Sequence, residues 1–133
     1  MVVSMTQLER WLAGFLDAKP SAIMWHHLKN ADIFRLRLLF YSFGDALTVA
    51  KMFEDELYPV TVTTNKVFTV NLYKREALLQ LLTRVKPFLM TERSRILTEI
   101  FLSALHAALR TTKGRAETLT RLYREWRRIK YSE

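Results

Sequence analysis

The chain has 133 residues, half of them apolar, which is enough for one domain with a sizeable hydrophobic core and excludes a disordered tail. It has no cysteine and only three glycines, which excludes zinc fingers, thiol nucleophiles, disulfides and the glycine-rich phosphate loops of P-loop and Rossmann enzymes. The 21 basic and 13 acidic residues leave a net charge of +8, which favours a polyanionic partner, nucleic acid first and an anionic membrane surface second.

The first predicted elements are a helix and a β-hairpin. Thr6 and Glu9 form a capping-box pattern that opens the helix, and Pro20 ends it. Residues 21–29 and 33–42 then alternate in polarity and are rich in Ile, Trp, Phe, Leu and Tyr. With Asn30-Ala31-Asp32 between them, these two segments predict a hairpin.

A second helix and a second hairpin follow. Asp45 is predicted to cap a helix over residues 46–57, with Leu57 among its inward-facing residues. Residues 60–63 and 67–72 are predicted to pair through a turn at Thr64-Asn65-Lys66.

Three helices complete the predicted order. They cover about residues 74–85, a long segment capped by Thr91, and about residues 115–130. We therefore expect an α+β domain over residues 1–110 with one antiparallel four-stranded sheet, in the order α-ββ-α-ββ-α-α. Residues 111–133 are expected to form an extra basic helix that packs on this domain or extends from it.

The alternation along the strands predicts which face of the sheet is exposed. Phe34, Leu36 and Leu38 form an apolar face, so the face that carries Arg35 and Arg37 is expected to meet solvent. A three-residue turn would place Trp25 opposite Arg37 and His27 opposite Arg35 on that same face. The expected exposed face comprises Trp25, His27, Lys29, Arg35, Arg37, Tyr41, Thr61, Thr63, Thr69 and Asn71.

This expected face has the composition of a nucleic-acid surface. Arginine and lysine neutralise phosphates, threonine and asparagine hydrogen-bond to sugars and bases, and tryptophan and tyrosine stack on bases. The face holds no carboxylate, whereas a face that is only solvated usually mixes both signs of charge. We therefore interpret it as a binding surface, with a merely solvated face as the alternative.

Three segments in register resemble the LAGLIDADG homing endonucleases. Trp11-Leu12-Ala13-Gly14-Phe15-Leu16-Asp17-Ala18 resembles the first helix of that family. The helix–hairpin–helix–hairpin–helix order is similar, and Val85-Lys86-Pro87-Phe88-Leu89 is similar to the segment before the family's fourth helix. Together these signals cover about residues 6–109.

The resemblance implies that the first helix pairs with a second copy, a second half or a partner protein, and that the exposed sheet face lies along nucleic acid. The small residues Ala13 and Gly14 would permit close approach of two helices. The expected helix-pairing interface is Leu12, Ala13, Gly14 and Leu16.

The same resemblance indicates that the catalytic metal site is lost. The family's motif ends in a second acid that binds the divalent metal, and Lys19 followed by Pro20 stands at those positions here. A cation repels Mg²⁺, and proline alters the backbone beside it. We therefore expect no catalytic residue, no metal, no cofactor and no small-molecule substrate.

The last predicted helix is the second candidate surface. If its apolar stripe packs inward, Arg121, Arg124, Arg128 and Lys130 would project as a basic strip suited to phosphate. A capping helix with a solvated side is the alternative, and we rank a membrane-surface helix below nucleic acid because the sheet face favours nucleic acid as well.

The sequence therefore predicts a non-catalytic nucleic-acid-binding protein derived from a LAGLIDADG endonuclease. Structured RNA is favoured over DNA, as an organellar ribosomal RNA or an intron held in a maturase-like way. This preference rests on Trp25 and Tyr41, which suit stacking on unpaired bases. The alternatives are a DNA-cleaving homing endonuclease with an atypical metal site and a DNA-binding regulator. The resemblance implies an organelle, the mitochondrion first, although no targeting segment is visible.

Overall fold

The computed structural model describes residues 6–29, 31–110 and 113–131. Asn30 of the predicted first turn and Thr111 and Thr112 of the predicted boundary lie outside the described residues. The elements are α1 (Gln7–Ala18), η1 (Pro20–Ala22), β1 (Ile23–His27), β2 (Asp32–Phe40), α2 (Phe43–Asp55), β3 (Thr61–Thr64), β4 (Phe68–Leu72), α3 (Arg75–Val85), η2 (Lys86–Phe88), α4 (Glu92–Leu109) and α5 (Arg115–Lys130). Their order confirms the predicted α+β class.

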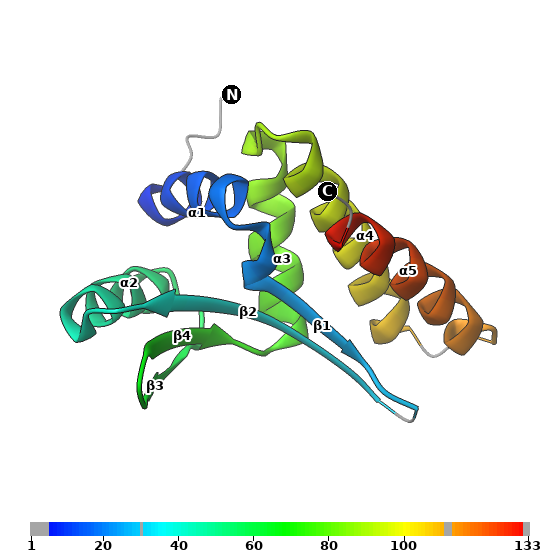
Figure 1. Ribbon diagram of the computed structural model, residues 1–133, viewed down its shortest axis with the longest axis horizontal. Coiled ribbons are helices and arrows are strands. Elements are labelled where there is room, and N and C mark those ends of the chain that lie inside the picture. The colour runs from blue at the N-terminus through cyan, green and yellow to red at the C-terminus, as the bar shows by residue number, and fades with distance from the viewer. Residues whose placement is uncertain (1–5, 30, 111–112, 132–133) are drawn as a thin grey trace.

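One antiparallel sheet organises the domain, with strand order β1-β2-β4-β3. The helices gather on one side of this sheet, with α2 over the β3–β4 end, α3 behind β2, α1 packed on α2 and α3, and α4 and α5 beside the β1–β2 hairpin (Figure 1). No helix in the described part of the chain covers the other face. We call this uncovered side the open face.

The apolar side of the strands forms the core, as predicted. Phe34, Leu36 and Leu38 of β2 are buried, and Leu38 pairs with the buried Val70 of β4. Burying these side chains against the helices removes apolar area from water, at roughly 25 cal/mol per Å². Because strand residues alternate between faces, this burial fixes Arg35, Arg37 and Leu39 on the open face.

Local capping explains where the helices begin. Thr91 caps α4 as predicted, accepting a hydrogen bond from the Ser94 N–H. Ser42, and not Asp45, caps α2, so this helix begins earlier than expected. The prediction that Leu57 faces inward is wrong, because α2 ends at Asp55 and Leu57 is exposed with a left-handed φ of 67°.

The register of the first hairpin corrects the predicted pairing. Four residues, and not three, separate the paired ends of the strands, so Trp25 lies opposite Phe34 rather than Arg37. A register shift by an odd number of residues exchanges the two faces of a strand. Trp25 is therefore on the helix-covered side, where it is 3% exposed and stacks on Phe34.

His27 is displaced for the same reason. It pairs with Asp32 and not with Arg35, and its ring lies on the helix-covered side. Met24 and His26 take the places on the open face that Trp25 and His27 were expected to occupy.

Helix α5 packs along α4 and reaches β1 through aromatic contacts. Leu119, Leu122 and Trp126 form its buried stripe, as the spacing predicts. The ring centroids of Tyr123 and Trp126 lie 5.0 and 6.0 Å from that of Trp25. No helix among the described residues is long and apolar enough to cross a membrane.

Candidate nucleic-acid interface

The open face of the sheet carries two arginines, several threonines and one asparagine, with apolar side chains beside them. Its strand residues are Met24 and His26 of β1, Ile33, Arg35, Arg37 and Leu39 of β2, Thr61 and Thr63 of β3, and Thr69 and Asn71 of β4. None of these described strand residues is acidic, as predicted for this face. Phosphates would therefore meet no like charge from the strands themselves.

Thr69 and Asn71 are on the predicted face but are not accessible. Each is 2% exposed, and the Asn71 side-chain amide donates to Thr69 Oγ1 at 2.9 Å. Thr63 also hydrogen-bonds to Thr69 through its hydroxyl. Thr69 and Asn71 therefore lie buried between the neighbouring strands. Of the four polar residues predicted on β3 and β4, only Thr61 and Thr63 on β3 are exposed.

The two arginines of β2 and Tyr41 after it are more accessible than Thr69 and Asn71. Arg35 and Arg37 are half-buried, and the Nε atom of Arg35 is itself buried without a hydrogen-bond partner among the described residues. Tyr41 lies just beyond β2 and is 83% exposed, so its ring is free to stack. Lys29 is exposed beyond the end of β1 and is not part of the sheet.

The end of α1 is held by a carboxylate that sequence reasoning described only as structural. The Asp17 oxygens accept hydrogen bonds from the backbone N–H of Met90 and Thr91, at 2.9 Å each, and from the Ser94 hydroxyl at 2.5 Å. Burial alone would raise the pKa of Asp17, but these bonds lower it below its ordinary value. Asp17 therefore anchors the first turn of α4.

A small pocket of about 220 Å³ lies between the end of α1 and the open face. It is lined by Lys19 beside Phe15, and by Arg37 with Met24 and Leu39 from the sheet. Two cations, Lys19 and Arg37, thus line this pocket. Lys19 comes two residues after Asp17, whose carboxylate already accepts hydrogen bonds from the start of α4.

These side chains do not fit a divalent metal ion. Mg²⁺ and Ca²⁺ take carboxylate and carbonyl oxygens, and the oxygens of Asp17 already accept several hydrogen bonds. No group of three or more His, Cys, Asp or Glu in the described ranges is arranged to hold a metal ion. The pocket beside Lys19 suits an anion.

The predicted helix-pairing residues are mostly turned inward. Leu12, Ala13 and Leu16 are buried in the core of their own domain, so the prediction that they meet a partner is wrong. They lie on the inner side of α1 because they share its apolar stripe with Leu8. Only Gly14 is exposed, and a side chain at Gly14 would meet no atom within 4 Å.

The basic strip on α5 is present in part. Arg121, Arg124 and Arg128 are exposed along one side of the helix. The prediction that Lys130 projects into solvent is wrong. Its side chain is half-buried, with Nζ 4.6 Å from the centre of the Trp126 ring, and burial lowers the pKa of Lys130. Its main-chain oxygen also accepts a hydrogen bond from Arg93, which ties the end of α5 to α4.

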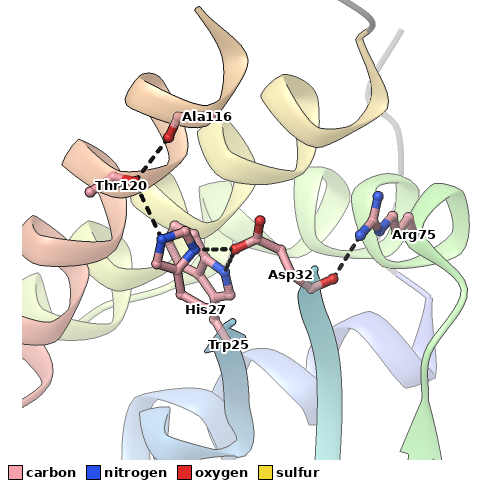
Figure 2. A network of polar contacts seen from close by, with 6 residues as sticks. All are labelled: Trp25, His27, Asp32, Arg75, Ala116 and Thr120. Carbon is pink, nitrogen blue, oxygen red and sulfur yellow. Dashed lines mark hydrogen bonds and ion pairs between the residues drawn. The ribbon is translucent and has the colours of Figure 1, made fainter. Parts of the chain in front are cut away.

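A polar network that sequence reasoning missed joins β1, β2 and α5 (Figure 2). Asp32 Oδ1 accepts from Trp25 Nε1 at 2.8 Å and lies 2.6 Å from His27 Nδ1. The other ring nitrogen of His27 is 3.3 Å from the Thr120 hydroxyl. The register error concealed this network, since it placed Trp25 and His27 on the other face.

Comparison with known proteins supports the fold. No protein-family profile matches the sequence, and no curated protein matches it. The structure is similar to that of the homing endonuclease I-TnaI, with a TM-score of 0.65 and 13% identity over 98% of this chain and 95% of that one. It is also similar to the homing endonuclease I-CvuI, with a TM-score of 0.52 and 14% identity over 94% of this chain and 96% of that one.

The I-CvuI structure is a complex with the I-CreI target in the presence of 2 mM Mg, and its DNA is not cleaved. Both similarities extend over nearly the whole of each chain. The chain therefore has the fold of these homing endonucleases, which confirms the predicted α+β domain with one four-stranded antiparallel sheet.

Proposed function

We propose that this protein binds nucleic acid through the open face of its sheet and does not cleave it. The observation that carries the proposal is the charge of this face, which holds Arg35 and Arg37 on β2, exposed threonines on β3 and no acidic residue on its described strands. Guanidinium groups bind phosphate oxygens in a bidentate way, and hydroxyls contact phosphates and sugars. The fold of the two homing endonucleases supports this use of the face.

The residues at the end of α1 support the absence of cleavage. Asp17 is engaged in anchoring α4, and Lys19, two residues further on, lines a pocket together with Arg37. A phosphate that approaches this point meets Lys19 and Arg37, which bind it but supply no metal-activated water. The protein therefore holds the strand at the position where an endonuclease would cut it.

Folded RNA is the ligand we favour. Stacking on Trp25 no longer supports this choice because Trp25 is buried, and Tyr41 is the stacking residue that remains. The support now comes from α5, whose exposed arginines lie on the other side of β1 from Arg35. Basic surfaces on two sides of one small domain suit an RNA whose helices crowd together, such as a ribosomal RNA or an intron in an organelle.

The test compares two double variants of equal charge. Arg35→Gln with Arg37→Gln changes the open face, and Lys51→Gln with Arg95→Gln removes two exposed charges from α2 and α4. Affinity for a folded RNA and for a DNA duplex of equal length is measured by fluorescence anisotropy over a range of salt. We expect the first variant to bind more weakly and to lower the salt slope by about two, roughly one for each arginine replaced, with the control unchanged.

The same samples address the enzymatic alternatives. Incubation of the RNA and of the duplex with Mg²⁺ is expected to leave both intact. Cleavage of the duplex would refute the non-catalytic role, and sequence-selective duplex binding tighter than RNA binding would favour a DNA-binding regulator. Duplex DNA remains the second candidate ligand because I-CvuI, which shares the fold, was solved with a DNA target.

Pairing through α1 is a separate part of the proposal. The outer side of α1 carries Arg10, Gly14 and Ala18, of which Gly14 leaves room for the close approach of a second helix. Light scattering is expected to show a dimer that Gly14→Arg converts to a monomer. A monomeric wild-type protein at micromolar concentration would refute pairing with a second copy.

A further inference from the structure

A second basic site lies away from the open face, in a cleft of about 500 Å³ between the end of the β1–β2 hairpin and the first turns of α5. Lys29 enters it from the hairpin, Arg75 from the start of α3, and Arg115 from the start of α5. His27 and Thr120 also line it, and Figure 2 shows these two side chains together with Asp32 and Arg75. Residues remote in sequence thus bring three cations to one cavity.

The single acidic residue of this cleft is already engaged. Asp32 Oδ1 accepts from Trp25 Nε1 and lies 2.6 Å from His27 Nδ1, so its carboxylate is directed toward the wall. Its main-chain oxygen accepts from the Arg75 guanidinium at 2.7 Å. The charge that the cleft offers to a ligand is therefore positive.

The three cations keep donors for a ligand. Of the five N–H groups of a guanidinium, Arg75 uses one on Asp32 and Arg115 uses one on the main-chain oxygen of Arg110, at 3.2 Å. Arg75 is also held in place by stacking over the Phe34 ring at 5.4 Å. Lys29 has no side-chain partner among the described residues. The hydrogen bond and the ring contact hold the Arg75 guanidinium in place, which reduces the entropy that this side chain loses on binding an anion.

The size of the cleft indicates that its ligand is larger than a bare anion. Its volume falls within the roughly 300–1,000 Å³ of pockets that hold small organic ligands and exceeds what a bare phosphate fills. The apolar side chains of Leu119 and Ala108 line it beside the cations. A phosphate with an attached sugar and base matches this mixture of charged and apolar walls.

We propose that the cleft formed by Lys29, Arg75 and Arg115 binds the phosphate group of a nucleotide, either free or within a nucleic-acid strand. Because the cleft adjoins Thr120 and Arg115 of α5, a strand that leaves it would continue along the arginines of that helix. The strand form of this proposal rests on the proposed function, and the free-nucleotide form does not.

The experiment uses the full chain and the paired substitution Lys29→Gln with Arg115→Gln, two exposed residues whose replacement leaves the core intact. Circular dichroism verifies that this variant folds, and Lys51→Gln with Arg95→Gln serves as the control of equal charge. Calorimetry measures the binding of adenosine 5′-monophosphate, inorganic phosphate and adenosine. Anisotropy measures the binding of the folded RNA.

Two results would support the proposal and identify the source of the phosphate. If the monophosphate binds and adenosine does not, a loss of about tenfold or more in the cleft variant alone indicates a free nucleotide. If the monophosphate does not bind, a loss of about tenfold in RNA affinity in the cleft variant, with the control unchanged, indicates a strand.

A cleft variant that binds every probe as the wild type does, or a wild type that binds none of them, would overturn the proposal. Where the wild type binds RNA, the open-face variant distinguishes failure of the cleft from failure of the proposed function. RNA binding that is lost with Arg35→Gln and Arg37→Gln but retained in the cleft variant refutes only the cleft. The reverse pattern refutes only the open face.

Discussion

Replacing Asp17 with Asn tests the assignment of this residue as an anchor of α4. The carboxylate accepts hydrogen bonds from the N–H groups of Met90 and Thr91 and from the Ser94 hydroxyl. The substitution keeps the shape of the side chain but removes its charge and one acceptor oxygen. Loss of a helix cap costs about 1 kcal/mol, and loss of a negative charge at a helix N-terminus costs roughly 0.3–1 kcal/mol more. We therefore expect the free energy of unfolding to fall by about 1.3–2 kcal/mol.

The assay is urea unfolding followed by circular dichroism, with Asp55→Asn as a matched control. Asp55 is an exposed carboxylate at the end of α2, and its replacement is expected to change the free energy of unfolding by less than about 0.5 kcal/mol. Equal effects of the two substitutions would refute the anchoring role. Asp17 would then be available to a metal ion, and the absence of cleavage would no longer be expected from the residues at the end of α1.

Three further expectations concern the same structure. The pKa of Asp17 is lowered from 3.8, so its stabilising contribution is present above about pH 3.8 and is lost as the pH falls through the folded value; the difference between wild type and Asp17→Asn in unfolding experiments is expected to shrink below that pH. Trp25→Ala is expected to cost about 3–5 kcal/mol of stability, whereas Tyr41→Ala leaves stability unchanged and weakens RNA binding by about 1–3 kcal/mol in anisotropy; an RNA affinity unchanged by Tyr41→Ala would exclude stacking there. Leu57→Gly is expected to raise the melting temperature, because it relieves the left-handed φ of 67° at an exposed residue, and a lower melting temperature would contradict that strain.

The order of elements was predictable because each carries a local signal. The bounds of α5 match the prediction, since its apolar stripe repeats at helical spacing from Leu119 to Trp126. Thr91 was recognisable as a cap because a threonine precedes a long amphipathic segment. The core face of β2 followed from strict alternation, which depends only on the geometry of a strand.

The register of the first hairpin was not predictable, because the pattern of polar and apolar residues in β1 does not determine the length of the turn. Both faces of β1 carry large side chains, so the sequence is compatible with either Trp25 or His26 on the core side of the sheet. Tertiary packing determines which face is buried. Trp25 lies on the core side because it packs against Tyr123 and Trp126 of α5.

The candidate site was predicted in its charge but not in its accessibility. Arg35 and Arg37 lie on the open face as expected, since they alternate with core residues. The burial of Thr69 and Asn71 depends on neighbouring strands that no local pattern describes. The cleft around Lys29 depends on the approach of α3 and α5 to the hairpin, which joins residues distant in sequence.

The most direct test of the central claim is to crosslink the native protein to its nucleic acid and to sequence the bound molecule while mapping the crosslinked peptides. We expect one dominant folded RNA, recovered intact, with crosslinks on β2 and β3 of the open face. Recovery of duplex DNA cut at a defined position, or crosslinks that avoid the open face altogether, would contradict the account.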